Sequence, residues 1–225
     1  MLHAQKYKML HAQKYNLSHL ADFRTYVHGP IQDDEALFLY SLCKMIRPST
    51  ILEFGVLDGL SSLNFASAKD SSAHLYSFDR RDGCIQKARQ KCHAFANCFF
   101  SVLDCTAFCH THVANRQVDI FFLDCSHVLE KNQICIESVI PCMSDAGIII
   151  IHDTGFYYKD TVPDWHVSFN RNFEDSDRMP VILAEQKTVD WMRESHSDWS
   201  QINFHSRNHF RHGMTFLQRS SFLSR

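Results

Sequence analysis

The stretch ILEFGVLDGLSS, residues 51–62, places Gly55 and Gly59 four positions apart, shortly after the acidic residue Glu53. An apolar segment precedes the glycines, and a helical pattern over 61–68 follows them. Glycine is favoured where the backbone turns tightly or approaches a ligand closely. The order strand, glycine turn, helix therefore predicts a nucleotide-binding turn at the carboxyl edge of an open parallel sheet.

The spacing of this turn, Glu-x-Gly-x-x-x-Gly, differs from the dinucleotide fingerprint G-x-G-x-x-G. A pyrophosphate needs backbone N–H groups at a helix start, whereas an acidic residue at a strand end suits a ligand with a cationic part. S-adenosylmethionine carries a sulfonium and an ammonium group, so it fits this turn. A side chain at Gly55 is then expected to enter the cofactor space. The alternative is a structural glycine turn in another α/β protein.

Composition restricts the classes that remain. The 225 residues are most economically one domain, and a net charge of −2 without a Lys/Arg tract argues against a nucleic-acid partner. No apolar run approaches the roughly 20 residues that span a bilayer, so no membrane partner is expected. The start lacks the apolar region of a signal peptide. Nine cysteines without a Cys-x-x-Cys pair indicate free thiols in a reducing compartment, and we expect a cytoplasmic location.

The amino-terminal segment MLHAQKY occurs twice, at 1–7 and at 9–15. Two copies are too few for a repeat architecture. We therefore expect residues 1–28 to be an extension, either a duplicated scar or a lid over the site. Residues 29–225 would form the single domain.

Apolar segments alternate with helical patterns along the rest of the chain, as in βαβ units. A helix is predicted over 33–46, and strands over 50–54, 73–79, 98–104, 118–124 and 146–153. Each strand reaches an acidic residue near its carboxyl end: Glu53, Asp79, Asp104, Asp124 and Asp153. A single such residue is usually a cap or turn former, and acidic residues are poor strand formers. Five of them at one sheet edge indicate a binding site.

Two of these acids are candidates for binding the nucleoside part of the cofactor. Asp79 follows the glycine turn by about 25 residues, a spacing typical of the acid that accepts hydrogen bonds from ribose hydroxyls. Asp104, with Cys105, could border an adenine ring. The alternative for both acids is an ordinary solvated helix cap.

The segment 121–156 carries the residues with catalytic chemistry. Asp124 leaves one predicted strand with His127 three residues later, and His152 with Asp153 leaves the next. Neighbouring strands would bring Asp124 and Asp153 within reach of one divalent cation of the Mg²⁺ type. His127 is then placed beside the metal as a general base. A lone loop histidine is more often structural, so the Asp-x-x-His and His-Asp pair carries this hypothesis.

These motifs resemble those of class I S-adenosylmethionine-dependent methyltransferases, in particular small-molecule and sugar O-methyltransferases of the macrocin and mycinamicin type. The resemblance runs from about Gly29 to the carboxyl terminus and rests on LEFGVLDGLSS, FLDCSH and IIIIHDT, with GPIQDDEALFLYSLC as the preceding helix. It implies a Rossmann-like α/β sandwich with a seven-stranded, mostly parallel sheet whose last strand is antiparallel. The final strand pair would be DWSQINF and HGMTFLQRS.

The resemblance also implies roles for individual residues. The residues that would hold the methionine end of S-adenosylmethionine are Glu53, Gly55, Gly59 and Ser61. Asp79 would bind the ribose, and Asp104 and Cys105 would border the adenine. The metal ligands would be Asp124, His152 and Asp153, and the general base would be His127. Asp124 is expected to border the cofactor as well. Relatives often have Asp or Glu at His152 and Asn at Thr154, and often Gly-Asp at 125–126, which leaves the third metal ligand open.

The activity implied is metal-assisted O-methylation of a hydroxylated small molecule. Region 156–198 would shape the acceptor pocket through Trp165, His166, Phe169, Trp191 and Arg193, although ordinary packing is an equal explanation. Two other functions stay open: a hydroxylase-like reaction with Fe²⁺ on His127, His152 and Asp153, and non-catalytic S-adenosylmethionine binding. A homo-oligomeric assembly also stays open.

Overall fold

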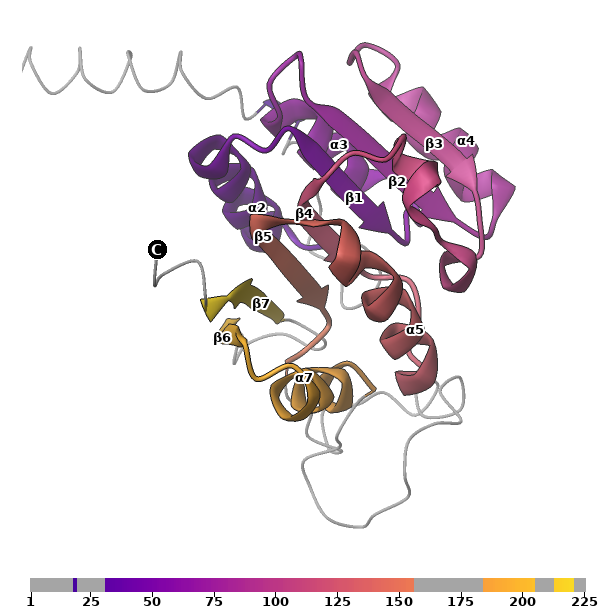
Figure 1. The fold of residues 1–225 in the computed structure, drawn as a ribbon. Helices are drawn as coiled ribbons and strands as arrows, with labels where there is room; N and C mark the ends of the chain where they lie inside the picture. Colours follow the sequence, from indigo (N-terminus) through magenta and orange to yellow (C-terminus); the bar gives the residue numbers. More distant parts are fainter. Residues whose placement is uncertain (1–17, 20–30, 156–183, 205–212, 221–225) are drawn as a thin grey trace, which may run out of the picture.

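The computed structural model describes residues 18–19, 31–155, 184–204 and 213–220 (Figure 1). Most of the expected extension 1–28 therefore lies outside the described residues. The same holds for three of the residues expected to line an acceptor pocket, namely Trp165, His166 and Phe169. The described parts contain the whole predicted sheet and, at its carboxyl edge, the loops after the first four strands and residues 153–155 after the fifth.

Seven strands form one sheet in the order β3-β2-β1-β4-β5-β7-β6. Their bounds are β1 Thr50–Phe54, β2 His74–Asp79, β3 Cys98–Val102, β4 Val118–Leu123, β5 Met143–His152, β6 Trp199–Phe204 and β7 Met214–Arg219. The first five strands pair in parallel, and β7 lies antiparallel between β5 and β6. The predicted fold, with an antiparallel last strand, is confirmed.

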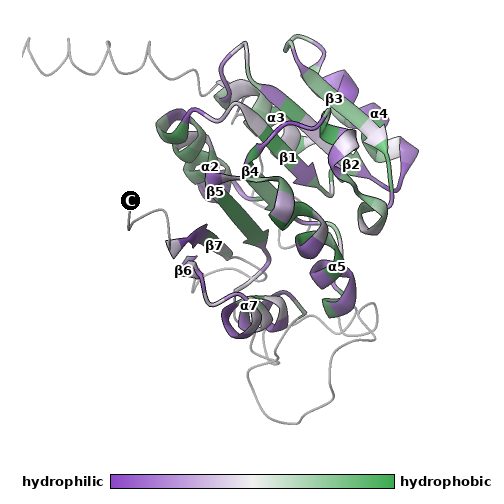
Figure 2. Ribbon diagram, in the orientation of Figure 1, coloured by the Kyte–Doolittle hydropathy of each residue, from purple (hydrophilic) through white to green (hydrophobic). Residues whose placement is uncertain are grey.

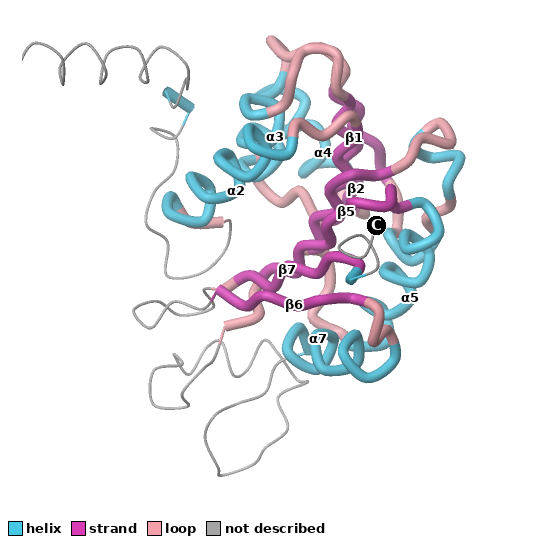
Figure 3. The backbone as a smooth tube through the Cα atoms, turned by 60° about the vertical axis from the view of Figure 1, so that its left-hand side comes forward, coloured by secondary structure: helices cyan, strands magenta, loops and turns pink. Residues whose placement is uncertain are grey.

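Helices cover both faces of this sheet (Figure 3). One face carries α2 Asp33–Ile46, α3 Leu60–Ala68 and α4 Asp82–Cys92, and the other carries α5 Leu129–Val139 and α7 Ala184–Ser195. Successive side chains of a strand point to opposite faces of the sheet, so each strand contributes to both layers. In β1, Ile51 packs in the core beneath α2, α3 and α4, whereas Leu52 and Phe54 pack in the core beneath α5 and α7. Figure 2 shows the apolar strands enclosed between these layers.

The helix α2 begins with a reciprocal cap. Gln32 is its N-cap residue, and the Glu35 carboxylate accepts a hydrogen bond from the Gln32 backbone N–H. Acidic residues in a first helical turn are also favoured by the helix dipole. Because Glu35 is buried, this cap places a carboxylate inside the protein, on the side that faces the end of β5.

The predicted element bounds differ from the structure mainly at strand ends. The helix over 33–46 and the strand over 50–54 match the structure, whereas β3 ends at Val102, β4 at Leu123 and β5 at His152. Asp104, Asp124 and Asp153 consequently lie just beyond their strands, in the connecting loops. Residue 153 also has a φ of 59°, a left-handed conformation that an extended strand does not contain.

All nine cysteines are free thiols. Within the described residues, no helix combines the length and the apolar character that crossing a membrane requires.

Candidate active site

The glycine turn after β1 is shaped by close backbone packing. Gly55 has a φ of +90°, and a Cβ there would lie 1.9 Å from the Asp124 carbonyl oxygen. Gly59 has a φ of +74°, and its Cβ would lie 2.7 Å from the Ala88 Cα on α4. The expected reason for Gly55, room for a cofactor, is therefore corrected: its missing side chain lets β1 and the exit of β4 approach each other.

Asp79 organises this turn from the end of β2. Its Oδ2 accepts the backbone N–H groups of Val56 and Leu57 at 3.1 and 3.3 Å, and its Oδ1 accepts the Arg81 N–H at 2.9 Å. Burial raises the pKa of the carboxyl, but these hydrogen bonds outweigh it and hold the pKa below its usual value. The structure thus places Asp79 against the predicted cofactor turn, and ribose binding stays a prediction.

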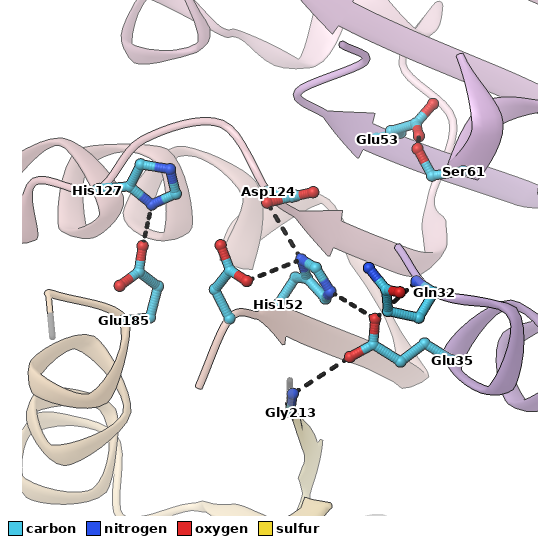
Figure 4. Close-up of polar contacts among 10 residues, drawn as sticks. Gln32, Glu35, Glu53, Ser61, Asp124, His127, His152, Glu185 and Gly213 are labelled. Atoms are coloured by element: carbon cyan, nitrogen blue, oxygen red, sulfur yellow. Dashed lines mark hydrogen bonds and ion pairs between the residues drawn. The ribbon is translucent and has the colours of Figure 1, made fainter. Parts of the chain in front are cut away.

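Glu53 is fully buried on the α3 side of β1. Its Oε1 accepts the Ser61 hydroxyl, and its Oε2 accepts the hydroxyls of Ser62 and Ser77, each at 2.5 Å. Burial raises the pKa of Glu53 to about 7, although the three hydroxyls oppose that shift. Figure 4 shows the Glu53–Ser61 pair apart from the residues around His152. The predicted contact of Glu53 and Ser61 with the methionine end is not tested by these bonds.

The two adenine-side residues lie in the loop after β3. Asp104 is exposed and caps a short 3-10 helix, Cys105–Ala107, by accepting the Thr106 N–H at 3.1 Å and the Thr106 hydroxyl at 2.8 Å. Cys105 is buried, and its thiol points to the Phe78 carbonyl at 3.9 Å. The helix cap that the sequence offered as the alternative for Asp104 is therefore present, and adenine binding by this pair stays a prediction.

The three predicted metal ligands come together at the ends of β4 and β5. Figure 4 labels two of them, Asp124 and His152. One ligand atom from each of Asp124, His152 and Asp153 lies within 4.8 Å of the others. The Nδ1 of His152 is 3.3 Å from Asp124 Oδ1 and 3.6 Å from Asp153 Oδ1. Adjacent parallel strands produce this convergence, because β4 pairs with β5 and their carboxyl ends share one edge.

The pKa of His152 depends on the carboxylates that surround its buried ring. Its side chain is 3% exposed, and its Nε2 lies 3.0 Å from Oε2 of Glu35. Burial alone lowers the pKa of His152, but the carboxylates of Glu35, Asp124 and Asp153 together raise it well above its ordinary value. Sequence reasoning missed Glu35, because its separation of 117 residues from His152 leaves no local signal.

His127 lies in the loop between β4 and α5 and hydrogen-bonds through Nδ1 to Oε1 of Glu185, near the start of α7 (Figure 4). The His127 side chain is 41% exposed, whereas that of Glu185 is 5% exposed. Glu185 is a second residue that the sequence analysis missed. The only signal for it was an acidic residue opening a helical pattern, which is common in helix first turns.

A second group of ligand atoms within 4.8 Å consists of His127, Asp153 and Glu185. Asp153 therefore belongs to both groups. Among the described residues, neither group unites His127 with His152, the pair on which the iron-based alternative depended.

Three further residues named in the sequence analysis have structural contacts. Thr154 is buried, and its hydroxyl accepts the Thr215 hydroxyl of β7 at 3.0 Å. Trp191 packs against the core beneath α7, and Arg193 is exposed in an ion pair with Asp190 at 2.6 Å. The contact of Trp191 supports the packing explanation for that residue, whereas for Arg193 an acceptor-pocket role stays a prediction.

Residues 52–154 match the family model described as a methyltransferase domain. This segment contains every residue predicted for the cofactor, the metal and the base. No curated protein matches the chain significantly. The matched segment is similar to a methyltransferase domain, and solved methyltransferase structures share the fold of the whole sheet.

Several solved structures share the fold at low identity. A Staphylococcus aureus protein assigned as a caffeoyl-CoA O-methyltransferase has a TM-score of 0.66 and 16% identity, over 97% of this chain and 100% of that one. A Bacillus cereus O-methyltransferase bound to S-adenosylhomocysteine has a TM-score of 0.61 and 13% identity, over 91% and 92%. The N-methyltransferase NodS of Bradyrhizobium japonicum has a TM-score of 0.59 and 13% identity, over 85% and 88%.

Proposed function

We propose that this protein transfers the methyl group of S-adenosylmethionine to a hydroxyl of a small molecule, with a divalent cation bound beside the acceptor. The observation that carries the proposal is a pair of groups at the carboxyl ends of β4 and β5, next to the turn after β1: Asp124 with His152 and Asp153, and His127 with Asp153 and Glu185. Ligands of open α/β sheets bind at this edge.

The His127–Glu185 pair supplies the base. With Nδ1–H donated to the Glu185 carboxylate, the neutral imidazole carries its lone pair on Nε2. Nε2 takes the hydroxyl proton while the oxygen forms a bond to the methyl carbon and the carbon–sulfur bond breaks. Buried Glu185 then stabilises the imidazolium that results.

The residues around His152 fit a divalent cation. Nδ1 of His152 is buried and makes no hydrogen bond, although it faces the carboxylates of Asp124 and Asp153. Two carboxylates and an imidazole nitrogen are competent ligands. A cation held there by Asp124, His152 and Asp153 would lower the pKa of the acceptor hydroxyl.

A hydroxyl acceptor suits the base better than an amine does. A neutral amine already carries the lone pair that attacks a methyl group, whereas a hydroxyl must lose its proton to become a strong nucleophile. The names of two similar structures point to O-methylation, but NodS, an N-methyltransferase, has the same fold. Fold alone does not select the acceptor atom, so the His127–Glu185 pair carries this choice.

The test incubates the purified protein with S-adenosylmethionine labelled on the methyl group and parallel panels of hydroxylated and amine acceptors. We expect label only in hydroxylated products, loss of transfer on chelation, and recovery when a divalent cation is restored. Asp153→Ala should weaken the cation-dependent turnover. Transfer to amines alone, or full activity under chelation, would refute the corresponding part of the proposal.

A further inference from the structure

His152 lies between carboxylates at both of its ring nitrogens. Nε2 lies 3.0 Å from Glu35 Oε2, and Nδ1 faces the oxygens of Asp124 and Asp153 at 3.3 and 3.6 Å. The ring is 3% exposed, and Nδ1 makes no hydrogen bond. This buried nitrogen has both carboxylates as ion-pair partners but no well-directed hydrogen bond to either, which is an arrangement that a cation between them would satisfy.

The carboxylate of Glu35 contacts three parts of the fold, and these contacts set the orientation of the His152 imidazole. Its Oε2 accepts the Gln32 N–H at 3.1 Å, and its Oε1 accepts the Gly213 N–H at 3.2 Å, just before β7 (Figure 4). The same carboxylate meets His152 Nε2 at the end of β5. When a cation takes the place of the Nδ1 proton and Nε2–H donates to Glu35, the lone pair on Nδ1 points toward Asp124 and Asp153.

The arrangement around His152 is typical of a metal-binding histidine. One ring nitrogen faces two carboxylates, and the other contacts the carboxylate of Glu35. Histidines that bind metals usually donate their other ring N–H to a carboxylate or carbonyl, which sets the tautomer and the ring orientation. Imidazole suits transition-series cations, whereas Mg²⁺ prefers oxygen ligands and retains water. The entry of His152 into the cluster therefore changes which cation the cluster favours.

We propose that His152 binds the cation through Nδ1, that Glu35 is its positioning residue, and that the centre selects a transition-series divalent cation over Mg²⁺. This inference deepens the proposed function at its metal site and replaces the Mg²⁺ expected from the sequence. It concerns cation binding alone, so it can fail or hold independently of methyl transfer.

The test titrates the full-length, metal-free protein with Mn²⁺, Co²⁺, Zn²⁺ and Mg²⁺ by calorimetry. At least one transition-series cation should bind tenfold or more tightly than Mg²⁺. Equal or tighter binding of Mg²⁺ would overturn the proposal, as would the absence of cation binding by the folded protein. Pulsed electron spin resonance of the Mn²⁺ complex provides a second measurement on the unaltered protein, in which coupling to a ¹⁴N nucleus should be present.

Substitutions test whether the nitrogen that binds the cation belongs to His152. In His152→Asp the ¹⁴N coupling should disappear and the preference over Mg²⁺ should shrink, because oxygen then replaces nitrogen. Glu35→Gln should weaken transition-cation binding by about 10- to 100-fold, the usual effect of losing a partner behind a metal ligand. Circular dichroism checks that each variant is folded, and if His152→Asp is not, retention of the coupling in His127→Asn decides the question.

The matched controls address the neighbouring group of His127, Asp153 and Glu185. His127→Asn should keep the ¹⁴N coupling, and Glu185→Gln should keep the cation affinity. Loss of the coupling in His127→Asn, with retention in His152→Asp, would place the cation in the other group and overturn the assignment to His152.

Discussion

Glu185 accepts a hydrogen bond from Nδ1 of His127, although 58 positions of sequence separate the two residues. The carboxylate is buried at the start of α7, while the imidazole is partly exposed beyond β4. A buried acceptor that orients a more exposed imidazole is an arrangement suited to a general base, because it fixes the tautomer.

Removing the imidazole should affect turnover rather than cofactor binding. We expect His127→Ala to lower kcat by roughly 10²- to 10⁴-fold, the usual contribution of a general base, with S-adenosylmethionine affinity nearly unchanged. Steady-state kinetics and calorimetry measure the two quantities. A parallel loss of thermal stability and cofactor affinity would indicate a structural histidine instead.

Removing the charge behind the imidazole should give a smaller but related effect. Glu185→Gln should lower kcat by roughly 10-fold or more, since the tautomer and the imidazolium lose their partner. The chain offers a matched control in Glu137, which pairs with His196 at 3.1 Å on the surface. Glu137→Gln should leave kcat unchanged, and equal losses in both variants would contradict the assignment.

The buried Glu53 should make stability depend on pH. Its pKa is raised from 4.5 to about 7, so the folded state holds the proton more tightly than the unfolded chain does. The resulting stabilisation is complete below about pH 4.5 and is lost as the pH rises through 7, a change of roughly 3 kcal/mol. Glu53→Gln should flatten this slope in urea unfolding at pH 5, 7 and 8.5.

The control for that experiment is Glu130→Gln, because Glu130 is exposed on α5. This variant should retain the slope of the parent protein. A Glu53→Gln variant with the parental slope would show that Glu53 is not the group responsible.

The glycine at the β1 turn should be required for stability. A Cβ at Gly55 would lie 1.9 Å from the Asp124 carbonyl oxygen, at a φ of +90°. We expect Gly55→Ala to reduce the free energy of unfolding by roughly 2 to 5 kcal/mol, from strain and overpacking together. Gly83 in α4 has nothing within 4 Å of its virtual Cβ, so Gly83→Ala should be neutral or stabilise by up to about 1 kcal/mol. Urea unfolding of both variants measures the contrast, and a Gly55→Ala protein as stable as its parent would disprove the packing role.

The sequence by itself determined the sheet and the edge at which the site lies. Local signals are sufficient there: strand periodicity predicts β1 to β5, and the glycine spacing predicts the turn between β1 and α3. Parallel pairing then brings the carboxyl ends together, so Asp124 and Asp153 were predicted to be neighbours from the order of strands alone.

Only the tertiary structure decided which groups surround the two histidines. Glu35 reaches His152 across 117 positions and Glu185 reaches His127 across 58, and each acid looks in sequence like an ordinary first-turn helix residue. The physical reason is that helix propensity and dipole terms place an acid at a helix start whatever faces it. Which side chain that acid meets depends on how α2 and α7 pack against opposite faces of the sheet, and that packing is set by contacts distant in sequence.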